Sequence, residues 1–542
     1  MISEEAFMPP FLFYLFGNQL KINYIYKYKT QNMLIKIYGS AIHGVAAQTI
    51  TIEVNVDTGI GYHLVGLPDN AIKESSYRIS AALKNVGYKI PGKKITINMA
   101  PADLRKEGSA YDLSIAVGIL AASDQIMADQ IQDYIIMGEL SLDGSLQPIK
   151  GVLPIAIQAK EEGFKGIILP LQNTKEAAIV NGLDVYGVQN IKEVIDFFNK
   201  EKTIEKVNLD IKKEFHEKID QFPFDFSEVK GQETAKRAME VAAAGGHNII
   251  LIGPPGSGKT MLAKRVPSIL PPLTLKEALE TTKIHSVAGK MGVETSLMTV
   301  RPYRSPHHTI SDVALVGGGS YPQPGEISLA HNGVLFLDEM PEFKRTVLEV
   351  MRQPLEDREV TISRAKFTVN YPASFMLVAS MNPSPSGFFP DDPGNTSSPY
   401  EMQRYMNKLS GPLLDRIDIH IEVQKVEFDQ LTEKRKGEKS EEIRKRVLKA
   451  REIQQQRYEH LKISYNAQMG SREIEQFCEL DETSVNLIKM AMEKLNLSAR
   501  AYDRILKVAR TIADLEGSEN IMSSHISEAI QYRSLDRGFW NG

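Results

Sequence analysis

The segment Gly253–Thr260 (GPPGSGKT) contains the residue types that wrap a phosphate chain. It follows Asn248–Ile252 (NIILI), an apolar run that predicts a buried strand, and it leads into a predicted helix through Met261–Val266. In this setting backbone N–H groups approach the phosphates, Lys259 reaches the β- and γ-phosphates, and the Thr260 hydroxyl ligates Mg²⁺. The positive end of the helix favours the same anion. We therefore expect ATP and Mg²⁺ to bind through Gly253, Pro254, Pro255, Gly256, Ser257, Gly258, Lys259 and Thr260.

Two acids follow a second apolar run. Gly333–Met340 reads GVLFLDEM, in which Val334–Leu337 predicts a short buried strand. Asp338, at the end of this strand, is expected to hold the Mg²⁺ shell, and Glu339 to orient and deprotonate the attacking water. Alone, the motif would describe an ordinary strand end with acids. The phosphate loop upstream favours the catalytic interpretation.

A third apolar run, Phe375–Ser380 (FMLVAS), precedes Asn382 and Pro383. An asparagine at a strand end opposite the γ-phosphate positions the lytic water. The alternative is that Asn382 only begins a turn before Pro383. We favour the catalytic interpretation.

Arg416 lies in Leu413–Ile417 (LLDRI). We expect it not to reach the phosphates of its own chain. It is expected instead to reach the nucleotide of a neighbouring subunit, an effect that contributes ~10³–10⁵ in rate for arginine fingers. The alternative is a surface salt bridge with Asp415 or Asp418.

Composition restricts the class of protein. A chain of 542 residues has room for about three or four domains. The net charge of −4 gives no global basic signature, so any nucleic-acid surface must be local. A single cysteine, Cys478, excludes a disulfide framework and a cysteine-based zinc site and fits a reducing cytosol, so we expect a cytoplasmic protein. No run of 18 apolar residues is present to span a membrane.

The sequence pattern of apolar and charged residues changes four times along the chain. The five expected segments are an extension at 1–32, a mixed strand and helix domain at 33–200, a charged linker at 201–221, the nucleotide domain at 222–423 and a helical domain at 424–542. In the second segment we expect strands at Thr49–Val56 and Ile95–Met99 and helices at Asn70–Val86 and Asp112–Ala122.

The first 32 residues carry the apolar run Phe11–Phe16, preceded by the acids Glu4 and Glu5. Acids stand here where a signal peptide has basic residues, and no small-residue cleavage site follows. We interpret 1–32 as a non-native or disordered extension, with Met33 as the true start. The alternative is a membrane-surface anchor.

These motifs, in this order, resemble the AAA+ family, and most closely its YifB/ComM-type magnesium-chelatase-like branch. The resemblance covers Met33 to the C-terminus and is carried by Asn332–Glu339 (NGVLFLDE), Gly411–Asp418 (GPLLDRID), Tyr303–Ser311 (YRSPHHTIS), Gly317–Gly319 and Ser498–Leu515. It implies an α/β fold, with a P-loop ATPase core and a helical C-terminal lid, working as a homo-hexamer. It also implies residue roles: Lys259 and Thr260 as Walker A, Asp338 and Glu339 as Walker B, Asn382 as sensor 1, Arg416 as the finger and Arg500, with Arg504 as its competitor, as sensor 2.

Glu139–Asn173 resembles the proteolytic domain of Lon, which implies an α+β domain of the ribosomal-S5 type before the ATPase. Aligned on this resemblance, Leu153 takes the place of the protease lysine, and Tyr111 or Asp112 that of the nucleophile. Ser109 lies close but out of register. A serine without a base is a poor nucleophile, so we expect the fold without peptidase activity.

The segment His285–Glu326 is longer than a minimal ATPase core needs. We expect a pore-facing or substrate loop, which carries Arg301, Arg304, His307 and His308. A metal site is disfavoured, because adjacent histidines rarely converge on one ion and no third ligand is evident.

Three functions are compatible with these motifs. The resemblance implies a ring motor on DNA, of the helicase or branch-migration type, in natural transformation or recombination. Local support comes from Arg301, Arg304 and Arg444–Arg451, although nearby glutamates make a solvated helix face the simpler interpretation of the last stretch. The alternatives are a protein-remodelling ATPase that binds partners through its amino-terminal domain, and a metal-chelatase-like motor subunit.

Overall fold

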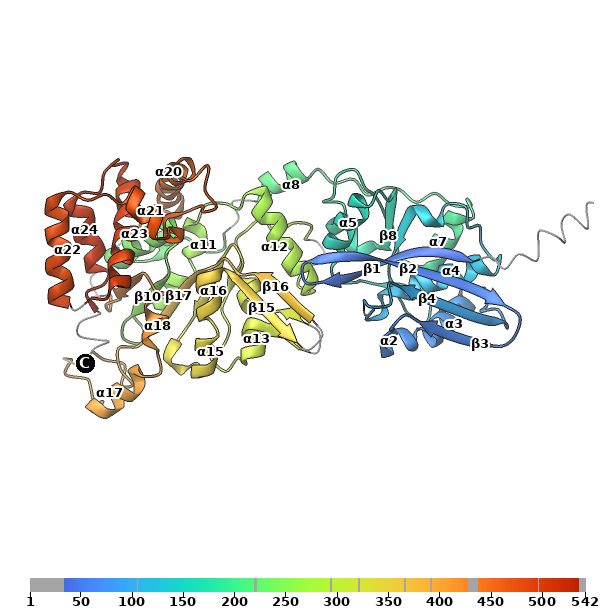
Figure 1. The fold of residues 1–542 in the computed structure, drawn as a ribbon, viewed down its shortest axis with the longest axis horizontal. Helices are drawn as coiled ribbons and strands as arrows, with labels where there is room; N and C mark the ends of the chain where they lie inside the picture. Colours follow the sequence, from blue (N-terminus) through green and yellow to red (C-terminus); the bar gives the residue numbers. More distant parts are fainter. Residues whose placement is uncertain are drawn as a thin grey trace, which may run out of the picture. The chain divides into compact units, whose positions relative to one another are not determined.

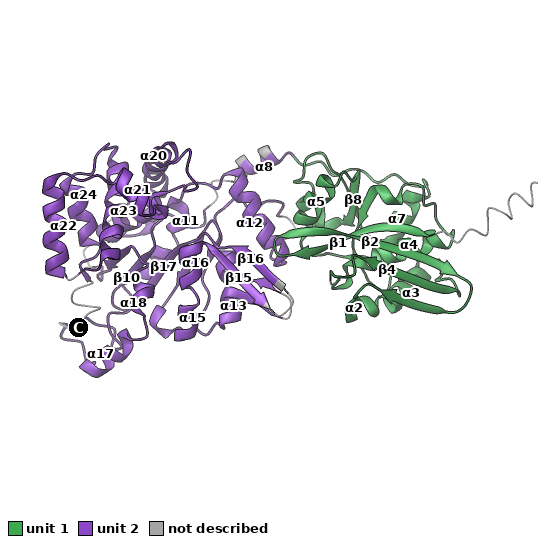
Figure 2. Ribbon diagram, viewed as in Figure 1, with its two compact units in different colours: residues 1–209 green, residues 210–542 purple. Residues whose placement is uncertain are grey.

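The computed structural model describes residues 34–104, 106–218, 222–292, 295–319, 322–364, 367–389, 392–426, 437–495 and 497–535. The chain divides into two compact units, Met1–Leu209 and Asp210–Gly542 (Figure 2). The expected extension at 1–32 lies outside the described residues. No helix in the described ranges is long and apolar enough to cross a membrane.

Unit 1 is built on a seven-stranded mixed sheet. Its order is β3 (Gly61–Val65), β4 (Lys94–Ala100), β2 (Ala46–Asp57), β1 (Ile35–His43), β5 (Tyr134–Ile136), β8 (Gly166–Pro170) and β9 (Asp184–Val188). β2 pairs antiparallel with β1 and β4, whereas β5, β8 and β9 continue in parallel. Alternate β2 residues Ile50, Ile52, Val54 and Val56 are buried, which confirms both predicted strands as half-buried members of the sheet.

Helices complete unit 1. They are α2 (Asn70–Lys73), α3 (Ser75–Asn85), α4 (Asp112–Ala122), α5 (Val152–Glu161), α6 (Thr174–Ala177) and α7 (Ile191–Phe198), with a short hairpin of β6 (Glu139–Leu140) and β7 (Leu146–Gln147). Every residue of α4 is buried, as its continuous apolar run predicts. The helix expected at Asn70–Val86 is interrupted at Glu74, where α2 ends and α3 begins.

Unit 2 contains a five-stranded parallel sheet. Its order is β11 (Tyr303–Arg304), β14 (Val334–Leu337), β17 (Met376–Met381), β10 (Ile249–Ile252) and β18 (Ile419–Glu422). The three central strands are buried on both faces, which explains their uninterrupted apolar sequences. All three strands predicted around the nucleotide motifs are therefore confirmed.

Helices and two small two-stranded elements surround this sheet (Figure 1). The helices before β18 are α8 (Ile211–Lys218), α9 (Glu233–Gly245), α10 (Lys259–Ala263), α11 (Val266–Ile269), α12 (Leu275–Val287), α13 (Asp312–Val316), α14 (Glu326–Leu329), α15 (Arg345–Glu349), α16 (Arg352–Asp357), α17 (Pro399–Met406) and α18 (Gly411–Leu414). The hairpin β15 (Glu359–Arg364) with β16 (Phe367–Pro372) and the pair β12 (Gly317–Gly318) with β13 (Gln323–Pro324) lie outside the main sheet. α8 falls within the segment expected to be only a linker.

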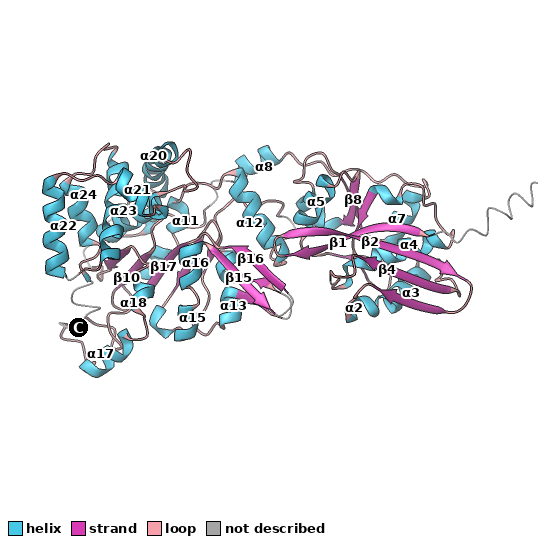
Figure 3. Ribbon diagram, viewed as in Figure 1, coloured by secondary structure: helices cyan, strands magenta, loops and turns pink. Residues whose placement is uncertain are grey.

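The described residues after β18 are mainly helical, as predicted (Figure 3). They form α20 (Ser440–Arg457), α21 (Ser471–Phe477), α22 (Glu482–Leu495), α23 (Ala499–Glu516) and α24 (Ser523–Gln531). Apolar residues of these helices share one continuous core with α9 and the sheet, for example Ile505, Val447 and Val241. The C-terminal helices and the sheet consequently form a single compact unit.

Candidate functional site

The order of the parallel sheet brings three strand ends together. The carboxyl ends of β14, β17 and β10 lie side by side, and they are followed by Asp338, Asn382 and the phosphate loop respectively. In open parallel sheets, ligands bind at the carboxyl ends of the strands. The structure thus collects the three sequence motifs that were predicted separately.

The phosphate loop is shaped by its glycines. Gly256 and Gly258 adopt positive φ angles of 77° and 92°, which disfavour other residues. At Gly253 a Cβ atom would lie 2.1 Å from the carbonyl oxygen of Val423, so the close approach of β18 requires glycine here. α10 then begins directly at Lys259.

Lys259 turns back into the loop. Its Nζ donates to the carbonyl oxygens of Gly253 at 2.6 Å and Pro254 at 2.9 Å, and to Oδ1 of Asn382 at 3.2 Å. The amino group is buried, which lowers its pKa, although Asp338 and Glu339 act in the opposite direction. A phosphate group would replace these neutral acceptors with charged ones.

Oxygen ligands suited to Mg²⁺ stand beside this lysine. The Thr260 hydroxyl donates to Oδ2 of Asp338 at 2.8 Å, and the Ser380 hydroxyl donates to Oδ1 of the same carboxylate. Hydroxyl and carboxylate oxygens are the ligand types that Mg²⁺ prefers. The donor set therefore fits ATP with Mg²⁺, held by the phosphate loop, Thr260 and Asp338.

Ser380 was not identified from the sequence as a site residue. It is the one hydroxyl residue in the buried strand β17, and it contacts both Asp338 and the backbone N–H of Glu339, the latter at 3.2 Å. A polar residue inside an otherwise apolar strand was the available signal. Tyr405 was also missed; its hydroxyl donates to the carbonyl oxygen of Asn382 at 3.1 Å.

Glu339 differs from Lys259, Thr260 and Asp338 in that it is exposed. Its backbone is left-handed, with φ of 52°, and its N–H donates to Oδ1 of Asp338 at 3.1 Å. A non-glycine residue in this region is uncommon and concentrates at functional sites. Its side chain is 57% exposed. The carboxylate of Glu339 thus faces solvent, directly after Asp338 in the chain.

The candidate arginines lie at the opposite side of the sheet, where the parallel strands begin. Ile249 pairs with Ile419, so Arg416 precedes the start of β18, whereas the phosphate loop follows the end of β10. The Arg416 side chain is only 8% exposed, and its guanidinium contacts Glu356 and the carbonyl oxygen of Pro412. The salt bridge is thus made with Glu356 and not with the aspartates considered from the sequence.

Arg500 and Arg504 occupy the same edge but differ in burial. Arg500 is 66% exposed and lies 3.3 Å from Oδ2 of Asp415. Arg504 donates to the buried Asp418 at 2.8 Å. Burial opposes ionisation of Asp418, but Arg504 and then His247 outweigh it and hold the pKa of this carboxyl well below its usual range. Arg504 therefore has a structural partner, and Arg500 is the accessible arginine of the two.

Three family models match successive parts of the chain. The model described as magnesium chelatase, subunit ChlI, covers residues 225–431; subunit ChlI of Mg-chelatase covers 52–173; and the subunit ChlI C-terminal model covers 437–533. The competence protein ComM of Haemophilus influenzae is 45% identical over 504 residues, which are 92% of this chain and 97% of ComM. The chain belongs to the YifB/ComM family of magnesium-chelatase-like proteins.

A second YifB/ComM relative, the uncharacterized protein YifB of Escherichia coli, is 44% identical over 503 residues, which are 92% of this chain and 97% of YifB. Lon protease 2 of Bacillus subtilis is 31% identical over 126 residues, which are 23% of this chain and 22% of that protease. The family and the parallel sheet support an AAA+ α/β ATPase, and the family implies the use of ATP and Mg²⁺.

The arginines expected to contact a substrate are engaged within the chain of this YifB/ComM-family member. Arg304 makes a bidentate pair with Glu326 at 2.6 and 2.7 Å, and Arg301 donates to the carbonyl oxygens of Pro271 and Asn332. Paired arginines are less available to a phosphate backbone. The expected pore or substrate loop therefore does not present these two side chains freely.

The basic stretch Arg444–Arg451 fits the interpretation as a solvated helix face better than that of a DNA-binding surface. Arg446 pairs with Glu240 and Glu438, and Lys445 with two glutamates one turn before it. Arg451 donates to the carbonyl oxygen of Ala243 at 2.9 Å and stacks over a tyrosine ring. Arg446 and Arg451 thus attach α20 to α9, and glutamates balance the charges of Lys445 and Arg446.

In unit 1, the positions aligned with the protease dyad hold packing groups. Leu153 is fully buried, and its N–H donates to the Glu176 carboxylate at 2.8 Å. Asp112 is buried and bound on both oxygens by Arg78, at 2.7 and 2.9 Å. The Tyr111 hydroxyl donates to a backbone carbonyl at 3.0 Å. The geometry gives these groups structural partners.

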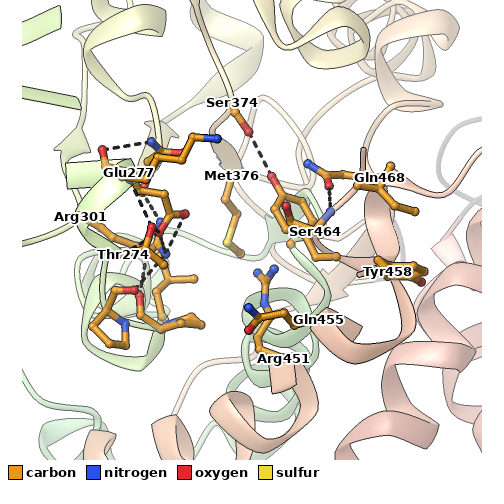
Figure 4. Close-up of a pocket in the computed structure, with 18 of the residues that line it drawn as sticks. Thr274, Glu277, Arg301, Ser374, Met376, Arg451, Gln455, Tyr458, Ser464 and Gln468 are labelled. Carbon is orange, nitrogen blue, oxygen red and sulfur yellow. Dashed lines mark hydrogen bonds and ion pairs between the residues drawn. The ribbon is translucent and has the colours of Figure 1, made fainter. Parts of the chain in front are cut away.

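A separate cavity of about 880 Å³ opens at the amino edge of the unit 2 sheet (Figure 4). Thr274, Glu277 and Arg301 line one side, and Tyr458, Ser464 and Gln468 line the other. Its lining includes Gly333 and Met376, which lie at the starts of β14 and β17. It is therefore distinct from the ATP site, which occupies the opposite edge.

Proposed function

We propose that this chain is a ring-forming motor that hydrolyses ATP. Lys259 and the loop amides hold the phosphates, Thr260 and Asp338 hold Mg²⁺, and bound Mg²⁺ neutralises charge that develops on the phosphates. Glu339 accepts the proton of the attacking water, and Asn382 orients that water. The observation that carries the proposal is the contact of Thr260 with Asp338 at 2.8 Å beside the exposed Glu339.

The position of the arginines supports a multi-subunit site. Arg416 and Arg500 precede and flank the start of β18, at the sheet edge opposite the phosphate loop of their own chain. In the proposed homo-hexamer they serve the nucleotide of the next subunit, with Arg416 as the finger and Arg500 as sensor 2. The helices after β18 then take the place of the lid, and unit 1 that of a Lon-like domain of the ribosomal-S5 type without peptidase activity.

We infer that the motor acts on DNA as a helicase of the branch-migration type. The support is the 45% identity to a protein named for competence, a process in which DNA is taken up. The internal pairing of Arg301 and Arg304 gives this substrate no additional support. The DNA-contacting groups are therefore expected among other residues of the ring channel.

Turnover of ATP with and without DNA tests this function. We expect branched or single-stranded DNA to raise the ATPase rate, and raised salt to abolish the increase, because phosphate contacts release counterions. Glu339→Gln protein, loaded with ATP, should retain DNA on a filter or in a mobility shift. A turnover rate that no DNA changes would refute the DNA assignment but leave the ATPase intact.

Protein remodelling is the second candidate, and one surface favours it. The edge strand β3 of unit 1 exposes large apolar side chains on and beside it: Ile60 is 94% exposed, Leu67 60% and Val65 52%. Exposed apolar groups at a sheet edge are typical of sites that bind other chains. Proteins recovered with ATP-trapped Glu339→Gln, but lost on Ile60→Lys, would favour this function over DNA.

A further inference from the structure

The histidines of the Tyr303–Ser311 motif are not used by the proposed chemistry. His308 nevertheless reaches the site: its Nδ1 lies 4.0 Å from Oε2 of Glu339. This separation is within ion-pair distance but beyond that of a hydrogen bond, and Lys259 acts on the same carboxylate electrostatically. The contact joins the segment after β11 to the residue after β14, two neighbouring strands of the sheet.

His308 is held in place by its surroundings. Its ring packs against that of His307, with centroids 4.1 Å apart, and meets the ring of Phe343 edge-on at 6.4 Å. Phe343 is buried, directly after the short 3-10 helix Met340–Glu342 that follows Glu339. His307 is exposed and is fixed by its own bond to the Thr309 hydroxyl at 2.9 Å. The imidazole, which is 34% exposed, is therefore packed between the rings of His307 and Phe343.

The Glu339 carboxylate, in contrast, has no comparable packing around it in the described structure. Hydrogen bonds from its N–H to Asp338 and Ser380 fix the backbone, but the side chain is long and 57% exposed. A long exposed side chain samples several rotamers. A general base must come within about 2.6–3.2 Å of the proton that it removes. The contact with His308 restricts the carboxylate to some of these rotamers.

We propose that His308 is a positioning residue for Glu339, holding the carboxylate that activates the attacking water. The inference rests on the proposed function, since Glu339 has to be the base. Within the described part of the chain, no hydrogen bond or ion pair joins His308 to the phosphate loop, so its effect is expected on the chemical step and not on ATP binding. His307, which only supports the ring from the exposed side, has a smaller effect.

Steady-state ATPase kinetics of the full chain provide the test. His308→Ala is expected to lower kcat about tenfold with KM for ATP unchanged, because small misplacements of a reacting group cost rate rather than affinity. His308→Asn places an amide nitrogen near the position of Nδ1 and should restore most of the rate. His307→Ala is the matched control and should change kcat less than twofold, by the same reasoning.

The Glu339→Gln background separates this inference from the proposed function. If His308→Ala lowers the residual rate of Glu339→Gln no further, the two residues act together as proposed. If His308→Ala leaves kcat unchanged or raises it, or if His308→Asn is as slow as His308→Ala, the positioning role is wrong. If Glu339→Gln itself hydrolyses ATP at the normal rate, the assignment of the base fails first.

Discussion

Two aspartates, one in each unit, show how the same chemical group serves different purposes. Asp112 in unit 1 is buried, and both its oxygens are bound by the Arg78 guanidinium. Asp338 in unit 2 is partly exposed and is contacted by the hydroxyls of Thr260 and Ser380. A carboxylate neutralised by a fixed cation is part of the framework. A carboxylate with neutral donors keeps its charge available to a bound cation.

The same contrast extends to the neighbouring residues. Around Asp338 the structure presents a lysine and an exposed glutamate, whereas Asp112 follows the buried Tyr111. Chemistry needs groups whose partners can be exchanged for substrate. Unit 2 meets that condition at the carboxyl ends of its strands, whereas in unit 1 the Arg78 guanidinium is fixed on both oxygens of Asp112.

The largest expected effect comes from Glu339→Gln, which removes the base and retains the shape. We expect ATP turnover to fall ~10³-fold, within the range for loss of general base catalysis. Binding of ATP should remain, because Lys259, Thr260 and Asp338 are untouched. Phosphate release and fluorescent-nucleotide binding measure the two properties separately. Loss of binding together with turnover would contradict the division of roles.

A smaller effect, on stability, is expected from Asp112→Ala. Removal of one partner of a buried ion pair leaves Arg78 without compensation and costs about 3 kcal/mol of unfolding free energy in unit 1. Denaturant unfolding followed by the tyrosines of unit 1 would measure it. The matched variant Asp338→Ala should change stability much less and abolish Mg²⁺-dependent turnover. Equal destabilisation by both would remove the distinction between framework and site carboxylates.

Ser109→Ala is expected to have no measurable effect. The resemblance to Lon aligns the buried Leu153 with the protease lysine, so we expect Ser109 to lack an activating base. Casein digestion and ATPase turnover should be the same for both proteins. Casein cleavage by the natural sequence that this variant loses would show that unit 1 retains a peptidase site.

Local sequence patterns predicted the elements that depend on near neighbours. The buried strands Ile249–Ile252 and Val334–Leu337 follow from apolar runs, and the phosphate loop follows from eight consecutive residues. Such features need little information from the rest of the chain. Their convergence at one edge depends on strand order, which the spacing of the motifs does not state.

Contacts between distant residues were harder to predict. The partner of Arg416 is Glu356, 60 residues earlier, and that of Glu339 is His308, 31 residues earlier. Neither pair shares an element, so no periodicity connects them. Helix α8 was missed for another reason: its charged sequence gives a weak apolar pattern, with Phe215 as a buried residue.

The parallel direction of β10 and β18 has a mechanical consequence for the proposed ring. β10 ends at the phosphate loop, and β18 begins shortly after Arg416 at the other end of the pair. Four paired residues span three rises of about 3.3 Å, which separate the first and last positions by roughly 10 Å. Because strands scarcely stretch, they form a stiff rod between two nucleotides. A shift of the loop on phosphate release would be delivered along that rod to the next subunit, with little lost to elastic deformation.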